Sequence, residues 1–158
     1  MLAANQSQEV CEKLDGYFLH HGQGEIADLG VVKMRLVVPE EETGGAFALA
    51  EFRGQEGAWT VPHIHERMEE SFYVLEGTFV FTLGEREVRA KQGDFVMVPR
   101  GTPHVMRAGA GGGALLTLFT PAGLERMFME LGRLPAAGIT DPAVRAEISK
   151  RHDSVPVS

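Results

Sequence analysis

The stretch VPHIHERMEESFYVLEG, residues 61–77, places two histidines one residue apart, ahead of a cluster of acidic residues. On a β-strand, residues i and i+2 point to the same face, so His63 and His65 would share one face while Ile64 points to the other. Two imidazoles on one face can bind a single metal ion. They can equally be ordinary polar side chains on an exposed strand, and the choice depends on a third ligand.

A third ligand from the acidic cluster requires a turn at ERME (66–69), so that the next strand runs back beside the histidines. That register places Glu70 next to them, with Phe72 and Val74 on the same face. A register shifted by one residue would place Glu69 there instead. The turn contains no Gly, Pro or Asn, so the hairpin has no strong turn signal of its own.

Length, composition and charge narrow the class of protein. The chain has 158 residues, 44% hydrophobic and 23% charged, which suits one soluble domain with an apolar core. Its formal net charge of −7 argues against nucleic acid or a membrane surface as partner, since both attract basic surfaces. The single cysteine, Cys11, has no partner for an internal disulfide. Without a signal-peptide pattern or a membrane-spanning run, the sequence predicts a cytoplasmic protein.

Residues 30 to 120 predict an all-β structure. Short runs rich in β-branched and aromatic residues are separated by Gly, Pro or acidic turn residues. These predicted strands cover 31–38, 46–52, 71–77, 78–83, 87–90, 94–99, 104–108 and 114–119. Many short strands at close spacing are typical of an antiparallel sandwich or barrel. The run GAGGGA (109–114) is interpreted as a flexible hairpin loop.

The pattern becomes helical after residue 120. An apolar stripe with the spacing i, i+3, i+4, i+7 indicates one face of a helix, formed by Leu124, Met127, Phe128 and Leu131. Thr120 as N-cap and Pro121 at the first position would begin this helix. A second helix is predicted over 142–151, with Asp141 as its N-cap.

The chain therefore divides into three predicted segments. Residues 1–15 form an arm or short helix, 16–120 a β-barrel, and 121–158 a helical extension packed on that barrel. A single small barrel has open sheet edges, which tend to be covered or paired. We therefore expect a two-fold homodimer built mainly from sheet contacts.

The two histidines also belong to a longer pattern of fixed spacings. From Gly57 to Gly77 the chain reads G-x5-HxH-x4-E-x6-G, and after 15 intervening residues it reads G-x5-P-x-G-x2-H from Gly93 to His104. These nine positions resemble the two motifs of the cupin family. The second motif of that family commonly ends in Asn, where this chain has Ala108.

The segments on either side of the motifs, 43–52 and 120–132, are similar to the flanks of small single-domain cupins of the quercetin-dioxygenase-like type. The resemblance implies a jelly-roll β-barrel with short C-terminal helices. It also implies four side chains converging on a metal ion inside the barrel: His63, His65, Glu70 and His104.

Such a ligand set favours particular metals. Three imidazoles and a carboxylate without a thiolate suit one divalent transition metal per chain, namely Fe, Mn, Ni, Co or Zn. Four protein ligands on an octahedral ion leave two positions for substrate and for O2 or water. A subset of four side chains is expected to line the cavity and to favour an apolar or aromatic ligand: Phe72, Met106, Phe79 and Phe47.

The resemblance implies a metal-dependent oxygenase acting on a small hydroxylated or aromatic molecule. In this interpretation Glu70 is both a metal ligand and the catalytic base. Two alternatives stay open because one fold hosts many activities. One is a metal-dependent isomerase or lyase, and the other is a non-catalytic domain that binds or senses a small molecule.

Overall fold

The structure, a computed structural model, describes residues 16–158, so the arm or short helix expected at 1–15 lies outside the described residues. Antiparallel strands dominate the described part, which confirms the all-β prediction. The strands are β1 (Ile26–Asp28), β2 (Val32–Val38), β3 (Ala48–Gly54), β4 (Gly57–Ala58), β5 (His63–Ile64), β6 (Glu69–Leu83), β7 (Arg86–Lys91), β8 (Phe95–Val98), β9 (His104–Thr120) and β10 (Val155–Pro156). The helices are α1 (Glu40–Thr43), α2 (Glu125–Gly132), α3 (Ala136–Thr140) and α4 (Pro142–Arg151).

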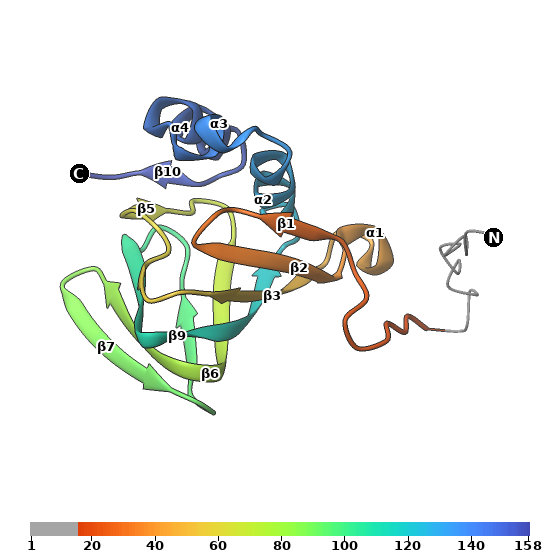
Figure 1. Ribbon diagram of the computed structural model, residues 1–158, viewed down its shortest axis with the longest axis horizontal. Coiled ribbons are helices and arrows are strands. Elements are labelled where there is room, and N and C mark those ends of the chain that lie inside the picture. Colours follow the sequence, from red (N-terminus) through yellow and green to blue (C-terminus); the bar gives the residue numbers. More distant parts are fainter. Residues whose placement is uncertain (1–15) are drawn as a thin grey trace, which may run out of the picture.

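Two long strands, β6 and β9, run antiparallel along most of the barrel (Figure 1). Their pairing extends from Glu69 opposite Thr120 to Leu83 opposite His104. Each long strand covers two of the predicted short ones. The interpretation of 109–114 as a hairpin loop was therefore wrong, because this run lies inside β9.

Glycines allow these long strands to bend where other backbone segments crowd against them. Gly77 and Gly112 have φ values of 81° and 75°, which residues with a side chain rarely adopt. A Cβ on Gly112 would lie 2.2 Å from the carbonyl oxygen of Gly54 in β3, and one on Gly77 would lie 2.4 Å from that of Gly112. The glycine run thus allows a bend within paired strands. In the sequence alone, such a run resembles a loop.

The barrel interior is filled mainly by aromatic rings. Phe72, Phe79, Phe81 and Phe119 are at most 1% exposed. Phe95, by contrast, is 62% exposed. Its strand β8 is short and directs this side chain to the outer face.

The two predicted helices are present, and the second begins where its sequence indicated. Asp141 accepts hydrogen bonds from the amides of Ala143 and Val144 at 2.9 and 3.3 Å, as expected of an N-cap. The first helix, α2, begins at Glu125 rather than after Thr120. Thr120 cannot start it, because this residue is still paired with Glu69 at the end of β9.

The segment after residue 120 covers one end of the barrel and then returns to it (Figure 1). The stripe of α2 is packed into the core: Leu124, Met127 and Leu131 are at most 6% exposed, and the Phe128 ring lies 4.9 Å from that of Phe52. After α4, β10 pairs with β5, placing Val155 opposite Ile64 and Pro156 opposite His63. This return strand was not predicted.

Within residues 16–158, no helix is both long enough and apolar enough to cross a lipid bilayer.

Candidate metal centre

Four side chains from three strands meet inside the barrel. His63 lies on β5, directly opposite His104 at the start of β9, while His65 follows β5 and Glu70 lies on β6. The Glu70 Oε2 atom is 3.2 Å from the Nε2 atoms of both His65 and His104, and the Nε2 atoms of His63 and His65 are also 3.2 Å apart. All four ligand atoms lie within 4.8 Å of one another. One cation could therefore contact all of them.

The route by which Glu70 reaches the histidines differs from the predicted hairpin. β5 pairs with β9 and β10, whereas β6 pairs with β7, β8 and β9. Strand β9 therefore lies between β5 and β6 and connects the two halves of the site. Residues 66–69 do not form the turn of a hairpin, in keeping with their weak turn signal. Glu70 nonetheless lies beside the histidines, as the first of the two predicted registers required. Glu69 is 35% exposed and pairs instead with Arg100, whose Nε atom lies 3.0 Å from its Oε1 atom.

Backbone carbonyl groups orient all three imidazole rings. The Nδ1 atom of His63 lies 2.7 Å from the oxygen of Val61, that of His65 lies 2.7 Å from Asp153, and that of His104 lies 2.9 Å from Thr102. A carbonyl oxygen only accepts, so each Nδ1 must carry the donated proton. In the neutral rings each Nε2 then presents a lone pair to the centre, which is the tautomer that binds metal.

Burial and charge reinforce this arrangement. The four side chains are at most 7% exposed. Burial, followed by the neighbouring His104, lowers the pKa of His63 to about 4. Burial opposes ionisation of Glu70, but the imidazoles of His104 and His65 hold its pKa well below the usual range. Burial likewise opposes charge on His65, whose pKa is nevertheless raised by the hydrogen bond and charge of Glu70. The site at neutral pH thus offers an ionised carboxylate beside imidazole donors, a set that suits a divalent transition metal.

Asp153, which follows α4, supports the site from outside the predicted motifs. Its backbone oxygen accepts the Nδ1–H of His65, while its carboxylate accepts the amides of Glu66 and Arg67 at 3.0 and 2.9 Å. Its φ of 59° is positive for a residue other than glycine. Sequence reasoning missed this residue, because nothing near position 153 signals contact with the HxH motif.

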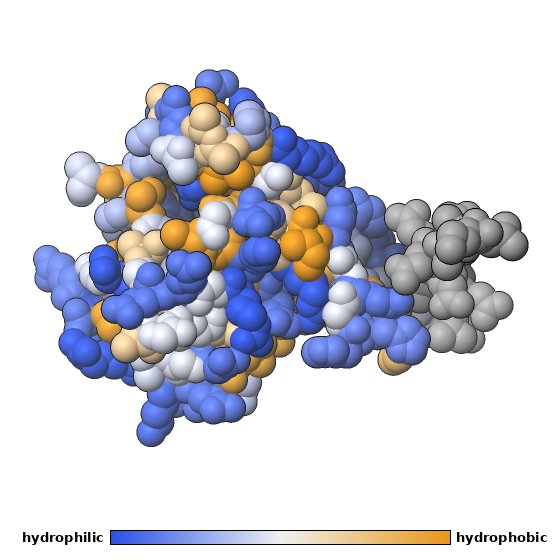
Figure 2. Space-filling view, in the orientation of Figure 1, coloured by the Kyte–Doolittle hydropathy of each residue, from blue (hydrophilic) through white to orange (hydrophobic). Residues whose placement is uncertain are grey.

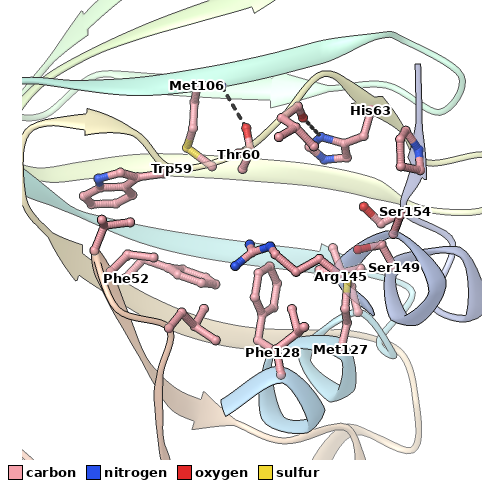
Figure 3. A pocket seen from close by; sticks show the side chains of 18 of the residues that line it. Phe52, Trp59, Thr60, His63, Met106, Met127, Phe128, Arg145, Ser149 and Ser154 are labelled. Carbon is pink, nitrogen blue, oxygen red and sulfur yellow. Dashed lines mark hydrogen bonds between the residues drawn. The ribbon is translucent and has the colours of Figure 1, made fainter. Parts of the chain in front are cut away.

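The site opens onto a cavity of about 390 Å³ between the barrel and the helices. His63, His65 and Glu70 line its inner end, and much of the remaining wall is apolar. Figure 3 shows the walls facing each other: Trp59, Thr60 and Met106 come from the barrel, and Met127 and Phe128 come from α2. On the outer face shown in Figure 2, apolar side chains gather where the helices meet the barrel.

Only Met106 of the four expected lining residues contacts this cavity. Phe72 does point inward, as its parity with Glu70 required, but its ring packs deeper in the core at 5.1 Å from that of Phe81. Phe79 is covered by Trp59, with 5.1 Å between the rings, and Phe47 lies at the surface with 36% exposure. The alternation of side chains along a strand predicts which face each one lies on. It does not predict how deep in the core the side chain lies.

Comparison with known proteins assigns this arrangement to a family. Residues 50–120, which include all four converging side chains, match the family described as Cupin domain. This part of the chain is a cupin domain. Solved structures with the same fold include KdgF from Halomonas sp., with a TM-score of 0.61 and 24% identity over 68% of this chain and 94% of that one. A cupin from Shewanella frigidimarina has a TM-score of 0.57 at 23% identity, covering 67% of this chain and 91% of that one.

Sequence relatives of the cupin domain include an enzyme. The chain is 32% identical to the quercetin 2,3-dioxygenase of Bacillus subtilis over 127 residues, which cover 78% of this chain and 38% of that protein. It is 35% identical over 75 residues to an uncharacterised protein of Methanocaldococcus jannaschii, covering 48% of this chain and 60% of that one. The chain thus spans less than two thirds of the length of these relatives.

Removing single ligands tests the metal centre. His63→Ala or His104→Ala should reduce bound metal from stoichiometric to a small fraction, because each change removes one of four donors. Glu70→Gln should also weaken binding, since it removes the one negative charge. Glu69→Gln is the matched control and should bind like the wild type. Elemental analysis and a metal titration measure these outcomes, and unchanged stoichiometry in both histidine variants would contradict the assignment.

The role of Asp153 can be tested separately. Asp153→Ala keeps the backbone oxygen that accepts the Nδ1–H of His65 but removes the carboxylate that fixes the 66–67 backbone. Metal binding should weaken, by less than the about 10- to 100-fold that follows loss of a direct outer partner. A competition titration with a chelator measures the affinity. Asp28→Ala, which changes an exposed aspartate that pairs with Lys33, should leave the affinity unchanged. Equal metal affinities for the two variants would show that the carboxylate of Asp153 does not support the site.

Proposed function

We propose that this protein is a metal-dependent oxygenase that acts on a small hydroxylated aromatic molecule. The observation that carries the proposal is that three of the four converging side chains, His63, His65 and Glu70, line a largely apolar cavity. A structural metal site is normally closed by protein ligands, whereas a catalytic one faces open space. Similarity to a quercetin 2,3-dioxygenase supports O2 as the co-substrate.

The chain's own residues have distinct roles in this proposal. His63, His65, Glu70 and His104 would hold one divalent ion, which when bound would polarise a substrate hydroxyl and provide a position for O2. Glu70 is the one carboxylate among the described residues that line the cavity. Its lowered pKa keeps it ionised but makes it a weak base on its own. The ionised Glu70 could accept the proton of a substrate hydroxyl that a bound cation has acidified. The apolar walls would orient the aromatic ring and exclude water.

The proposed activity is tested by O2 uptake. Protein loaded in turn with Fe, Mn, Ni, Co and Zn is mixed with flavonols and catechols in an oxygen electrode, and products are identified by mass spectrometry. We expect uptake with at least one metal, and Glu70→Gln should lower kcat about 100-fold through loss of the base. Glu69→Gln should retain activity.

Other outcomes of this assay contradict the oxygenase. Conversion of a substrate without O2 uptake would indicate an isomerase or lyase. Binding without any conversion would indicate a sensing or carrier domain.

We further propose that the protein forms a two-fold homodimer. Three apolar side chains on the outer face of β6 and β8 support this proposal: Tyr73, Phe95 and Met97, which are 45–62% exposed. Tyr73 and Phe95 lie opposite each other in the sheet. An exposed apolar cluster of this kind is typical of an interface.

Light scattering tests the assembly. The mass should be twice that of one 17.2 kDa chain, and Phe95→Glu should halve it by placing a charge in the contact. Phe47→Glu, at an exposed phenylalanine outside this cluster, should leave the mass unchanged. A wild-type mass of a single chain would contradict the dimer.

A further inference from the structure

Arg145 is the one Lys or Arg among the described residues that line the cavity. It lies on α4 and is partly buried. Figure 3 shows its side chain extending from the helix into the cavity, with the guanidinium directed towards the wall that carries Phe52 and Trp59. The charge therefore lies at a partly buried position beside a largely apolar wall, where a ligand with the opposite charge would stabilise it.

The guanidinium has few partners in the described part of the chain. Its Nη1 atom donates one hydrogen bond, to the backbone oxygen of Ile139 at 3.0 Å. Among residues 16–158, no carboxylate forms an ion pair with Arg145. Burial alone lowers the pKa of its guanidinium. Arg35 offers a contrast, since this similarly sheltered arginine has an Nη2 atom 2.6 Å from the Oε2 atom of Glu51.

Most of the hydrogen-bonding capacity of Arg145 is therefore unused. A guanidinium carries five N–H donors in a planar fork that matches the two oxygens of a carboxylate. One donor is committed to Ile139, which also fixes the side chain relative to α3. The hydroxyl groups of Ser149 and Ser154 also line the cavity, and Figure 3 shows them on the side of Arg145 away from its guanidinium.

The charge balance of the cavity also favours an anion. Glu70 contributes the one negative charge among the lining residues, and a divalent ion would exceed it. Together with Arg145, the loaded cavity would be positive although the chain as a whole is negative. At the Arg145 end a singly charged group is the better match, because Arg145 is the one cation among the described lining residues there and a phosphate dianion would normally face more than one.

We propose that Arg145 binds the carboxylate of the substrate, which identifies the substrate as a small hydroxylated aromatic carboxylic acid. Its hydroxyl groups would face the metal centre, its ring would lie between the apolar walls, and its carboxylate would pair with Arg145. The assignment of the hydroxyl end rests on the function proposed above. The carboxylate end rests on the cavity and on Arg145.

Binding of matched acids and amides tests this proposal without turnover. Zinc-loaded protein is titrated in a calorimeter with dihydroxybenzoate, dihydroxyphenylacetate and dihydroxycinnamate, and with the primary amide of each. The series varies the distance between ring and carboxylate. The wild type should prefer at least one acid over its amide by about tenfold or more, as a charge-assisted pair provides.

Variants at two positions on α4 then test whether Arg145 causes the preference for acids over amides. Arg145→Gln should reduce the acid-to-amide ratio to near one while leaving amide affinity unchanged, and Arg145→Lys should retain part of the preference. Lys150→Gln removes an exposed positive charge from the same helix and should leave the ratio at its wild-type value. Thermal unfolding of each variant checks that α4 is intact, and the Lys variant keeps the test valid if the Gln variant unfolds.

The possible results separate this inference from the oxygenase proposal. Equal affinity for acids and amides, no binding of any acid, or a preference that survives in Arg145→Gln would each overturn the role of Arg145. Oxygen uptake with neutral substrates would then still support the oxygenase. An Arg145-dependent preference for acids without any oxygen uptake would retain the binding inference and overturn the oxygenase.

Discussion

The structure depends on three backbone carbonyl groups that hold three imidazole rings in one tautomer. Val61, Thr102 and Asp153 each accept the Nδ1–H of a histidine. The Nε2 lone pairs are thereby forced together around a buried carboxylate. Such an arrangement brings electron-rich atoms close together and suits a cation between them. The barrel supplies the rigidity that keeps them there, because its close-packed aromatic core fixes the strands that carry them.

The sequence was sufficient for the barrel and for the convergence of four side chains inside it. The spacing of residues along the chain predicted both features. Two motifs, whose glycines mark fixed bends, contain His63, His65, Glu70 and His104. The predicted hairpin was wrong even though Glu70 was placed correctly. Parity determines the face of a strand on which a side chain lies, and it does not determine which neighbour that strand pairs with.

The cavity walls could not be read from the sequence for a related reason. Phe72 and Phe79 have the inward direction that was expected, yet the depth of the core decides that other rings cover them. The true walls combine barrel residues such as Phe52 with Phe128 and Arg145, which lie far along the chain. No local pattern brings α4 to the mouth of the barrel. The short pairing of β10 with β5 brings α4 there instead. A strand of two residues has almost no signal in the sequence.

Asp153 has a consequence for the order in which the protein matures. The ribosome produces the four ligand side chains well before it produces Asp153 and β10, which complete the support of His65. A barrel formed from the earlier residues would present its ligands to solvent at an uncovered mouth. The ring of His65 is thus the last of the three to gain its partner, because that partner is one carbonyl oxygen far along the chain.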